Sequence, residues 1–379
     1  MLPDVVASSV LLNDFQRQWT EIGSDVHAAV ELVGTSGWYI LGQEVRDFEA
    51  AFASFWPAAH VVGVGSGLDA IEIALRVAGL RLGDRVLTTP LSAFATTLAI
   101  VRAGGIPVFC DTDAGGLMDL DEADAVLEAE PAIRFLIPVH LYGYSLDLDR
   151  LAALRDRHEL TLIEDCAQSV GATWNGRRTG TVGQVAATSF YPTKNAGAMG
   201  DGGAVITSDL KFAERARQLR DYGQSAKYRH DELGWNSRLD ELHAAILRRA
   251  ILPRLGTWTE HRRQIASRYL SGIKHPEVRL LTPPAASQPC GHLFPVFVEH
   301  AQRESLQSWL KQQGVQSGQH YPLLITQQLA LGTVPWVAWG DLPNAAAVAA
   351  GEISLPIHPH LRDSEAEQVI TAVNSWPSK

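Results

Sequence analysis

The chain is poor in cysteine, which limits the kinds of site it can build. Its 379 residues include three cysteines, Cys110, Cys166 and Cys290. They are widely spaced, odd in number and match no metal-ligand spacing. Cys110 and Cys166 lie in apolar runs, where a thiol acts as a small buried hydrophobic group. The cysteine pattern therefore predicts no metal site.

Positive charge and long apolar runs are also scarce. Acidic residues outnumber basic ones by 42 to 32, for a formal net charge of −10. This balance argues against nonspecific binding to nucleic acid or to an anionic membrane. No run is long and apolar enough to span a membrane, and the stretch from Met1 to Val10 is short and lacks a basic leader. We therefore expect a protein of the reducing cytoplasm.

What remains is an ordinary globular composition, 46% hydrophobic and 20% charged, which is enough to form large cores. The length suits two domains, or one large domain with a smaller one appended. We place the boundary near Thr257. This division predicts a large ligand-binding domain of residues 1–256, with a helical segment at its start, and a small α+β domain of residues 257–379.

Short apolar strands alternate with helical segments from His60 onward. Strands are expected at 61–64, 86–88, 108–111, 135–139 and 160–165, with helices at 69–77 and 93–102 between them. This alternation predicts an α/β fold with a mostly parallel sheet covered by helices. Ligands bind beyond the carboxyl ends of such strands, and the polar residues or turns expected there are Ser66, Pro90, Asp111, His140 and Asp165.

Helical periodicity outside this region predicts further elements. We expect helices at 14–32, 43–55, 210–219, 239–252, 259–270, 305–313 and 364–373, and a strand at 293–298. Pro253 is expected to end the helix at 239–252. Trp38 and Tyr39, between the first two helices, are expected to pack them together, since aromatic residues are more often core than site.

The stretch from Leu162 to Ser208 carries the clearest chemical signal. Asp165 ends one apolar strand, and Lys194 follows another after a Ser-Phe-Tyr-Pro turn. A carboxylate that faces the pyridinium nitrogen and a lysine that forms the Schiff base are the groups that pyridoxal 5'-phosphate (PLP) requires. Alone, the acid would be a helix cap and the lysine a solvated side chain. Their ordered combination indicates a PLP pocket.

Aromatic neighbours should tune the lysine. Phe190, Tyr191 and Pro192 suggest a partly desolvated site for Lys194, which would lower the amine pKa and favour nucleophilic attack. The freed amine can then move a proton between the substrate α-carbon and the cofactor. Gln168 is either a hydrogen-bond donor to the ring's phenolic oxygen or a solvated residue at a helix start.

A glycine-containing turn offers a phosphate site. Gly65 to Asp69 joins a strand to a helix, where the backbone can approach a ligand closely and free N–H groups attract phosphate. Such turns are common, so this signal is weak by itself. Ser189 and Asn236 could add the hydroxyl and the amide that a monophosphate needs.

Together these segments resemble the DegT/DnrJ-type sugar aminotransferases, which have the fold type I (aspartate aminotransferase) architecture. The resemblance covers nearly the whole chain. The segments that carry it are 63–70 (GVGSGLDA), 138–143 (PVHLYG), 164–168 (EDCAQ), 189–195 (SFYPTKN), 234–241 (GWNSRLDE) and 320–322 (HYP).

The resemblance implies a role for each matching residue of the PLP pocket. Lys194 would form the Schiff base with PLP, Asp165 would meet the pyridinium nitrogen, and Gln168 would meet the phenolic oxygen. Ser189 would bind the phosphate. The backbone partners of that phosphate would be Gly67, Leu68 and Asp69.

The resemblance also implies partners. Asn236 matches an asparagine that reaches into the neighbouring subunit's pocket, so a homodimer with shared active sites is expected. His320 and Tyr321 would lie near the sugar nucleotide, and Tyr39 and Tyr191 are further candidates for substrate contacts.

Two positions depart from the family pattern. Leu68 stands where many members have threonine, so only its backbone N–H can serve the phosphate. Many members also stack an aromatic residue on the pyridine ring, from the segment that here runs from Leu91 to Thr96. Either Ala93 holds that position and stacking is weaker, or the register slips and Phe94 stacks.

The function that the resemblance implies is transfer of an amino group from an amino acid, expected to be L-glutamate, to a nucleotide-linked keto sugar. The Gly200-Asp201-Gly202-Gly203 sequence favours C3 of a dTDP-3-keto-6-deoxyhexose, because enzymes that aminate C4 more often carry Glu-Gly-Gly. A 4-keto sugar nucleotide or an aminocyclitol ketone is the alternative acceptor.

Two functions without transamination are disfavoured. Dehydratases and deoxygenases of the family generally replace the lysine with histidine, whereas this chain has Lys194. A non-catalytic regulator with a PLP fold would not need the intact set of Asp165, Gln168, Ser189 and Lys194.

Overall fold

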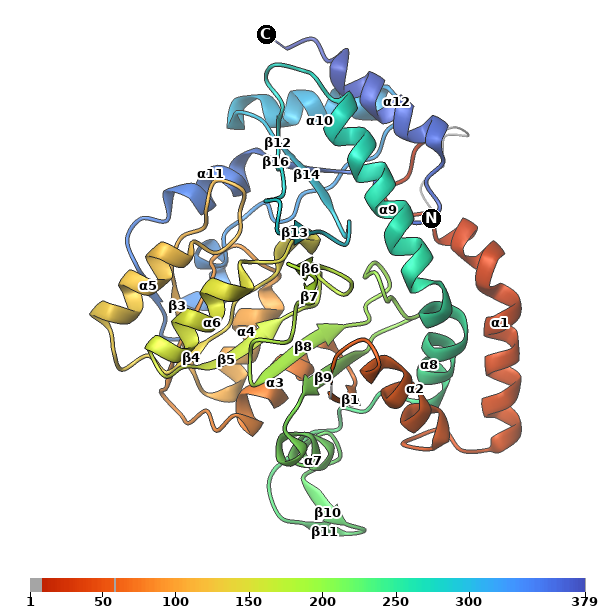
Figure 1. Ribbon diagram of the computed structural model, residues 1–379, viewed down its shortest axis with the longest axis vertical. Helices are drawn as coiled ribbons and strands as arrows, with labels where there is room; N and C mark the ends of the chain where they lie inside the picture. Colours follow the sequence, from red (N-terminus) through yellow and green to blue (C-terminus); the bar gives the residue numbers. More distant parts are fainter. Residues whose placement is uncertain (1–8, 58, 379) are drawn as a thin grey trace.

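The computed structural model describes residues 9–57 and 59–378 (Figure 1). Residues 1–8 lie outside it, and with them most of the stretch in which a basic leader was found lacking. In the described part of the chain, no helix combines the length and the apolar character needed to cross a membrane.

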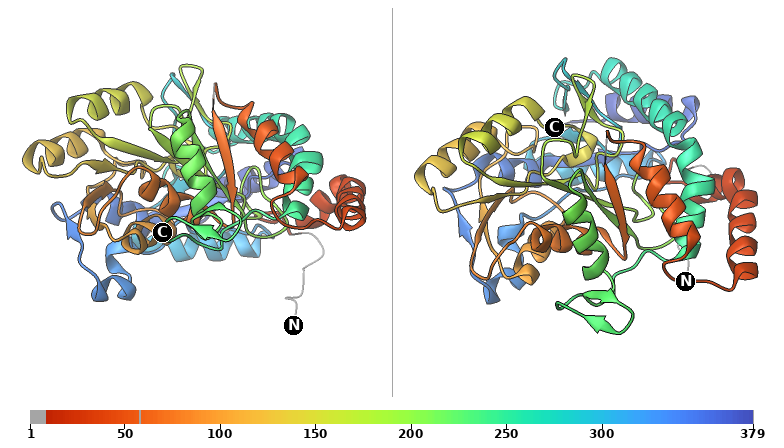
Figure 2. Two further views of the ribbon diagram at one scale, coloured as in Figure 1. Left: turned by 90° about the horizontal axis from the view of Figure 1, so that it is seen from below. Right: turned by 60° about the horizontal axis from the view of Figure 1, so that its bottom comes forward.

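A central sheet forms the body of the molecule, and within the described residues it has eight strands in the order β1-β9-β8-β5-β4-β2-β3-β15 (Figures 1 and 2). β9 runs antiparallel to both of its neighbours, and the other neighbouring pairs are parallel. The predicted α/β fold with a mostly parallel sheet is thereby confirmed. The strands are β1 (His60–Val64), β2 (Arg85–Thr88), β3 (Ile106–Phe109), β4 (Phe135–Leu136), β5 (Thr161–Asp165), β8 (Val185–Ser189), β9 (Gly203–Thr207) and β15 (Val337–Ala338).

Helices surround this sheet and a smaller one. They are α1 (Phe15–Ser36), α2 (Gln43–Ala53), α3 (Gly67–Val77), α4 (Phe94–Ala103), α5 (Leu120–Ala129), α6 (Leu148–Arg157), α7 (Leu210–Leu219), α8 (Glu241–Ile246), α9 (Leu252–Gly272), α10 (Arg303–Gln312), α11 (Pro343–Gly351) and α12 (Asp363–Asn374). Shorter helical turns are η1 (Leu141–Gly143), η2 (Leu247–Ile251), η3 (His300–Gln302), η4 (Ile325–Gln327) and η5 (Leu329–Thr333).

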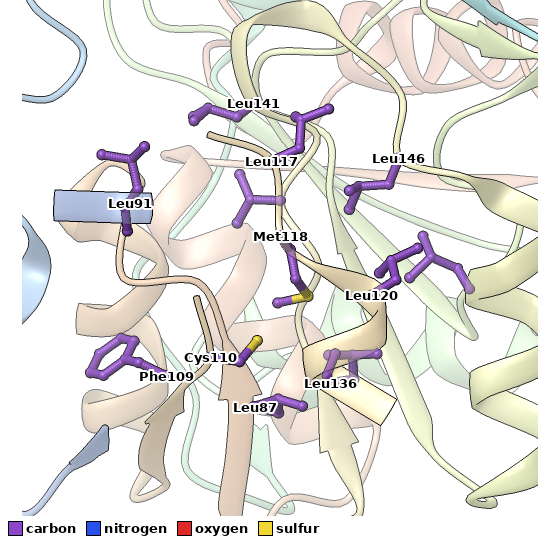
Figure 3. Packing of buried hydrophobic residues seen from close by; sticks show 14 of the residues in the cluster. Leu87, Leu91, Phe109, Cys110, Leu117, Met118, Leu120, Leu136, Leu141 and Leu146 are labelled. Atoms are coloured by element: carbon purple, nitrogen blue, oxygen red, sulfur yellow. The ribbon is translucent and has the colours of Figure 1, made fainter. Parts of the chain in front are cut away.

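Helices bury both faces of the large sheet, and successive side chains of each strand point to opposite faces. Val205 packs with α3, α4 and α7 on one face, whereas Ile206 packs with α1, α2 and α8 on the other. Farther along that second face, α5 and α6 cover a cluster that includes Leu87, Cys110 and Met118 (Figure 3). All three cysteines are free and buried, as the apolar runs around Cys110 and Cys166 predicted.

The C-terminal part of the chain builds a smaller antiparallel sheet, in the order β12-β14-β16. α9, α10 and α12 pack on it through a buried cluster that includes Ile265, Leu306 and Val369. Its strands are β12 (Arg279–Leu280), β14 (Phe294–Phe297) and β16 (Glu352–Leu355). The remaining short strands are β6 (Thr173–Trp174), β7 (Arg177–Arg178), β10 (Gln224–Ala226), β11 (Arg229–His230) and β13 (Ser287–Gln288).

The expectation that Pro253 ends a helix is wrong. α8 passes through the π-helical turn η2 into α9, with Pro253 in the first turn of α9. A π turn changes the local hydrogen-bond ladder, which accommodates the missing N–H and the ring of proline without ending the helix. The expected domain boundary near Thr257 falls inside α9. The division at residues 256 and 257 therefore stays a proposal.

Candidate active site

A cavity of about 470 Å³ lies beyond the carboxyl ends of β1, β5 and β8. This is the end of the sheet at which the expected parallel strands predicted a ligand site. The cavity brings together residues that are far apart in the sequence. Those predicted from the sequence are Gly67, Leu68, Asp165, Gln168, Ser189, Tyr191, Lys194, His320 and Tyr321.

Lys194 lies in the loop between β8 and β9, which the core holds in place. Phe190 packs its ring against Phe48 and Phe52, at centroid distances of 5.3 Å in both cases. The Lys194 N–H donates to the Tyr191 carbonyl at 2.8 Å and closes a tight turn. Burial of the side chain lowers the Lys194 pKa to about 8, while the charge of Asp165 acts in the opposite direction. This direction is the one expected from the sequence.

Asp165 ends β5 with its carboxylate fixed from two sides. Oδ2 accepts a hydrogen bond from the Thr96 hydroxyl at 2.8 Å, and Oδ1 accepts one from the Ala167 N–H at 3.0 Å. Thr96 Oγ1 lies 3.2 Å from Ser92 Oγ. Thr96 was not predicted as a site residue. Its signal was a pair of hydroxyl residues four positions apart at the start of a helix that follows a parallel strand.

Gln168 links the end of β5 to the C-terminal part of the chain. Its Oε1 accepts from the Tyr142 N–H at 2.6 Å, and its Nε2 donates to the Tyr321 hydroxyl at 3.1 Å. The Tyr142 hydroxyl in turn donates to the His320 carbonyl at 2.7 Å. The amide is therefore oriented, with one N–H committed to Tyr321 and a second one left for a further acceptor.

The N-terminus of α3 forms one wall of the cavity. A Cβ added at Gly67 would lie 2.6 Å from Ser189 Cβ, so this close approach requires glycine. Gly67 and Leu68 border the cavity. The Asp69 N–H, in contrast, donates to Ser66 Oγ at 3.1 Å as the helix cap. The phosphate contact expected from Asp69 would require that N–H to leave Ser66.

Two predicted residues lie away from the cavity of their own chain. Tyr39 is 59% exposed, and Asn236 is exposed with its Oδ1 accepting from Arg238. Neither borders the cavity. At the segment considered for ring stacking, Ala93 borders the cavity, whereas Phe94 packs against the buried cluster around Leu91.

Two histidines in the cavity wall are kept neutral by their surroundings. Burial, with Lys194 nearby, lowers the His320 pKa to about 4. The same two causes, burial first, lower the pKa of His292 well below its usual value. His292 was not predicted, because a single histidine in a loop carries no local signal. Its Nδ1 lies 3.3 Å from the Asn195 side-chain oxygen.

Other polar residues at the strand ends are structural. Both Asp111 oxygens accept backbone N–H groups at the start of α11, from Asn344 at 2.8 Å and Ala345 at 2.7 Å. His140 Nδ1 accepts the Leu146 N–H at 3.1 Å, and its Nε2–H donates to the Glu164 carboxylate at 3.0 Å. Such residues position the strand ends instead of lining the cavity.

The ligating atoms of His140, Glu164 and Cys166 lie within 4.8 Å of one another. Glu164 already accepts from the backbone N–H groups of Gly180, Val182 and Gly183, each at 2.7 Å, besides its contact with His140. Burial raises the pKa of the Cys166 thiol well above its usual value, which disfavours the thiolate that a metal would need. The cluster therefore serves to fix β5 beside the loop at 180–183.

The groups around the cavity fit PLP part by part. One cavity is surrounded by a half-buried lysine with a lowered pKa, an oriented carboxylate, an oriented amide and a hydroxyl beside a helix N-terminus. Together with the mostly parallel sheet, they define a PLP-dependent enzyme of the aspartate aminotransferase fold.

Comparison with known proteins then gives the family. The model of the DegT/DnrJ/EryC1/StrS aminotransferase family matches residues 20–374. The chain belongs to this family of PLP-dependent aminotransferases, and the resemblance inferred from its motifs is confirmed.

Individual relatives extend along nearly the whole chain. It is 41% identical to a dTDP-3-amino-3,4,6-trideoxy-alpha-D-glucose transaminase of Streptomyces venezuelae, over 97% of this chain and 96% of the relative. It is 38% identical to a "pleiotropic regulatory protein" of Geobacillus stearothermophilus, over 96% and 98%. The crystal structure of S. venezuelae DesV superposes with a TM-score of 0.93 at 40% identity, covering 98% of this chain and 100% of the DesV chain.

Proposed function

We propose that the protein transfers an amino group from L-glutamate to the C3 ketone of a dTDP-linked 3-keto-6-deoxyhexose. The observation that carries the proposal is the half-buried Lys194 side chain beside the fixed Asp165 carboxylate in one cavity. The 41% identity to a transaminase named for a dTDP-3-amino sugar supports this choice of acceptor.

In this proposal each residue has a defined part in the chemistry. PLP, when bound through a Schiff base to Lys194, supplies an electron sink for the carbanion. Asp165 keeps the ring nitrogen protonated, and the Gln168 amide donates to the phenolic oxygen. Lys194 Nζ, once released from the cofactor, would take the proton from the α-carbon of the amino donor and deliver it to C4′ of the cofactor.

The phosphate would be held at the N-terminus of α3. Ser189 supplies a hydroxyl, and the Gly67 and Leu68 N–H groups supply the backbone donors. The helix dipole adds a favourable field for an anion. Because Gly67 approaches Ser189 closely, the hydroxyl and the helix start border the same part of the cavity.

The most specific part of the proposal is the position of the ketone that is aminated. Asp201, in the Gly200-Asp201-Gly202-Gly203 segment, borders the cavity, so the residue that differs from the Glu-Gly-Gly pattern has access to a bound sugar. This position supports the C3 ketone. A 4-keto sugar nucleotide or an aminocyclitol ketone is the alternative outcome of the substrate test below.

We further propose a homodimer with shared active sites. Among the described residues that border the cavity, the basic ones are Lys194, His292 and His320, and both histidines have lowered pKa values. A nucleotide diphosphate needs further cations. The hairpin β10–β11 projects from the body of the molecule and carries exposed Lys227 and Arg229 near its tip (Figure 1).

Asn236 follows this hairpin and is exposed. In the dimer we propose, the hairpin and Asn236 of each chain contribute to the other chain's cavity, and Tyr39 and Tyr191 add aromatic contacts to the substrate. Dimers of this kind are symmetric, so each subunit contributes the same residues to its partner's site.

We also propose that the chain divides into a cofactor-binding part, residues 1–256, and a smaller part, residues 257–379. We propose further that the three free thiols reflect a reducing cytoplasm.

The function is tested with a panel of keto sugar nucleotides. The purified protein, loaded with PLP, is incubated with glutamate and each acceptor, and products are identified by mass spectrometry and NMR. A dTDP-3-amino-3,6-dideoxyhexose is expected from the matching 3-keto sugar, and Lys194→Ala is expected to give no product by multiple turnover. Amination only at C4, or only of a cyclitol, would replace the proposed acceptor.

A non-catalytic regulator, the alternative to an enzyme, predicts a different result in this test. A relative bears the name of a regulatory protein, so retained binding without turnover is a meaningful result. If the protein gains the cofactor's visible absorption but glutamate leaves that absorption unchanged, the transaminase function is rejected. Bleaching by glutamate and recovery with the keto sugar are expected.

A further inference from the structure

A chain of hydrogen bonds runs from the cavity into the small sheet. The His320 ring borders the cavity, and its Nδ1 lies 2.9 Å from Ser354 Oγ. The Ser354 hydroxyl donates to Glu352 Oε1 at 2.5 Å. Glu352 Oε2 also accepts the backbone N–H of His320 at 2.6 Å, so the first and last residues of this hydrogen-bond series also contact each other directly.

The fold places these residues in line. Glu352 and Ser354 are two apart in β16, so their side chains lie on the same face of the strand. Gly318 and Ser354 exchange backbone hydrogen bonds of 2.9 and 3.0 Å, which brings the segment of His320 alongside β16.

The carboxyl at the inner end is deeply buried. Glu352 is 1% exposed and Ser354 is 0% exposed. The hydrogen-bond partners of the carboxyl are a hydroxyl and a backbone N–H instead of a cation. Burial raises the pKa of Glu352 to about 8. The group can therefore exist in either protonation state near neutral pH, unlike an ordinary surface glutamate.

Because a serine hydroxyl both donates and accepts, the hydrogen bonds between His320, Ser354 and Glu352 can all point in either of two directions. In one, His320 Nδ1–H donates to Ser354, Ser354 donates to the Glu352 carboxylate, and Nε2 presents a lone pair. In the other, protonated Glu352 donates to Ser354, Ser354 donates to Nδ1, and Nε2 carries the hydrogen. The His320 ring is neutral in both.

We propose that Glu352 and Ser354 form a proton relay that lets His320 act as the base for the incoming amino donor. The donor arrives as an ammonium ion and must lose a proton before its nitrogen can attack. Its N–H bond breaks and a bond to His320 Nε2 forms. The Nδ1 proton then passes to Ser354, and the Ser354 proton passes to Glu352, which becomes a neutral carboxylic acid.

The surrounding charges favour a relay over a protonated histidine. Lys194 and burial oppose a positive charge on His320 and lower its pKa to about 4. Arg303 on α10 favours the charged form of Glu352 but does not overcome burial. The other titratable neighbours are His292, whose pKa is lowered by burial, and the phenols of Tyr142 and Tyr321, whose pKa values are raised by burial, so all three stay neutral.

The inference rests on the proposed transaminase function for its substrate, but its first test needs no substrate. The PLP-loaded protein is labelled with ¹⁵N-histidine, and the His320 signals are assigned by their loss in His320→Gln. In the wild type, the neutral tautomer should change from Nε2–H to Nδ1–H as the pH rises through about 8. In Glu352→Gln and in Ser354→Ala, one tautomer should persist throughout.

Glu299→Gln is the matched control, because Glu299 is an exposed glutamate of the same part of the chain. It should leave the tautomer change of His320 intact. If the wild-type tautomer is indifferent to pH, or if Glu352→Gln leaves the change as it was, the relay is rejected. Thermal unfolding of each variant shows whether the fold is retained.

A kinetic test follows the donor half-reaction alone, as single-turnover bleaching of the cofactor by glutamate. Glu352→Gln should slow it by roughly tenfold or more, within the range of general acid–base effects, with the half-saturating glutamate concentration unchanged. An unchanged rate rejects the relay. A relay that passes both tests while no keto sugar is aminated rejects the proposed acceptor only.

Discussion

The Lys194 amine is the residue whose chemistry depends most on its surroundings. A free lysine has a pKa of about 10.4, whereas burial lowers that of Lys194 to about 8. The neutral amine is the nucleophile, so the rate at which PLP attaches to cofactor-free protein should rise with pH through about 8 and then level off. Stopped-flow absorbance across a pH series measures this rate.

Asp165 provides a check on the cause of that shift. Its carboxylate favours the ammonium form of Lys194, so Asp165→Asn should move the midpoint of the attachment rate to lower pH. A midpoint near that of free lysine in the wild type would show that the amine is solvated.

Thr96 is predicted to act through Asp165. Thr96→Val removes the 2.8 Å hydrogen bond to the carboxylate while keeping the shape of the side chain. Hydrogen bonds to charged groups contribute about 1.5–3 kcal/mol, so kcat should fall by roughly ten- to a hundredfold, and Thr96→Ser should restore most of it. Steady-state kinetics measure both variants. Equal loss in the valine and serine variants would point to packing instead.

The site residues divide by how local their signal is. Asp165, Gln168, Ser189 and Lys194 were predicted because they lie in short segments whose order along the chain is typical of a PLP site. Thr96 and His292 reach the cavity only through the fold, since each comes from an element that contacts the site by packing. Single hydroxyl and imidazole groups are too common in proteins to mark a site.

At the scale of elements, Glu241 joins two helices. It stands at the start of α8, yet its carboxylate accepts three backbone N–H groups around the start of α2, from Gly42 at 2.7 Å, Glu44 at 2.8 Å and Val45 at 3.0 Å. These are donors that a helix start leaves without partners, and the negative charge also matches the helix dipole.

Glu241→Ala would leave these donors without their acceptor in a buried place. We expect a loss of about 2 kcal/mol in the free energy of unfolding, as for a strong helix cap. Glu241→Gln, which keeps one acceptor oxygen, should lose less. Urea unfolding at one fixed protein concentration measures both, because association also contributes to stability. A loss confined to activity would contradict the capping role.

Elements were predicted best where their cause is local. α7 (Leu210–Leu219) has the predicted bounds, since an apolar periodicity follows a capping aspartate, Asp209. The direction of β9 and the existence of β15 depend on partner strands distant in the sequence. α9 continues past Pro253 for a similar reason, because the π turn before it is held by packing.

At the scale of the whole molecule, the shared-site dimer makes a prediction about mixtures. Lys194→Ala and Asn236→Ala should each be weakly active or inactive alone. When subunits are exchanged, hybrid dimers contain one cavity with a native Lys194 and the partner's Asn236, so activity should return. The mixture is assayed after co-refolding.

Lys194→Ala mixed with Asp165→Asn is the matched control, because both residues belong to the cavity of one chain. In that hybrid every site is damaged, and no activity should return. Recovery in both mixtures would contradict a site shared in the proposed way, as would recovery in neither.

β15 has a consequence for anyone who would exchange parts between relatives. Val337 and Ala338 come from the C-terminal third of the chain but pair with Val108 and Phe109 of the large sheet. In a chimera joined near residue 257, β3 would pair with an edge strand from the other parent protein. A truncation there would leave β3 as an exposed edge strand that could pair with other chains. Residues 1–256 therefore do not form an independent module, because their sheet pairs with a two-residue strand from the rest of the chain.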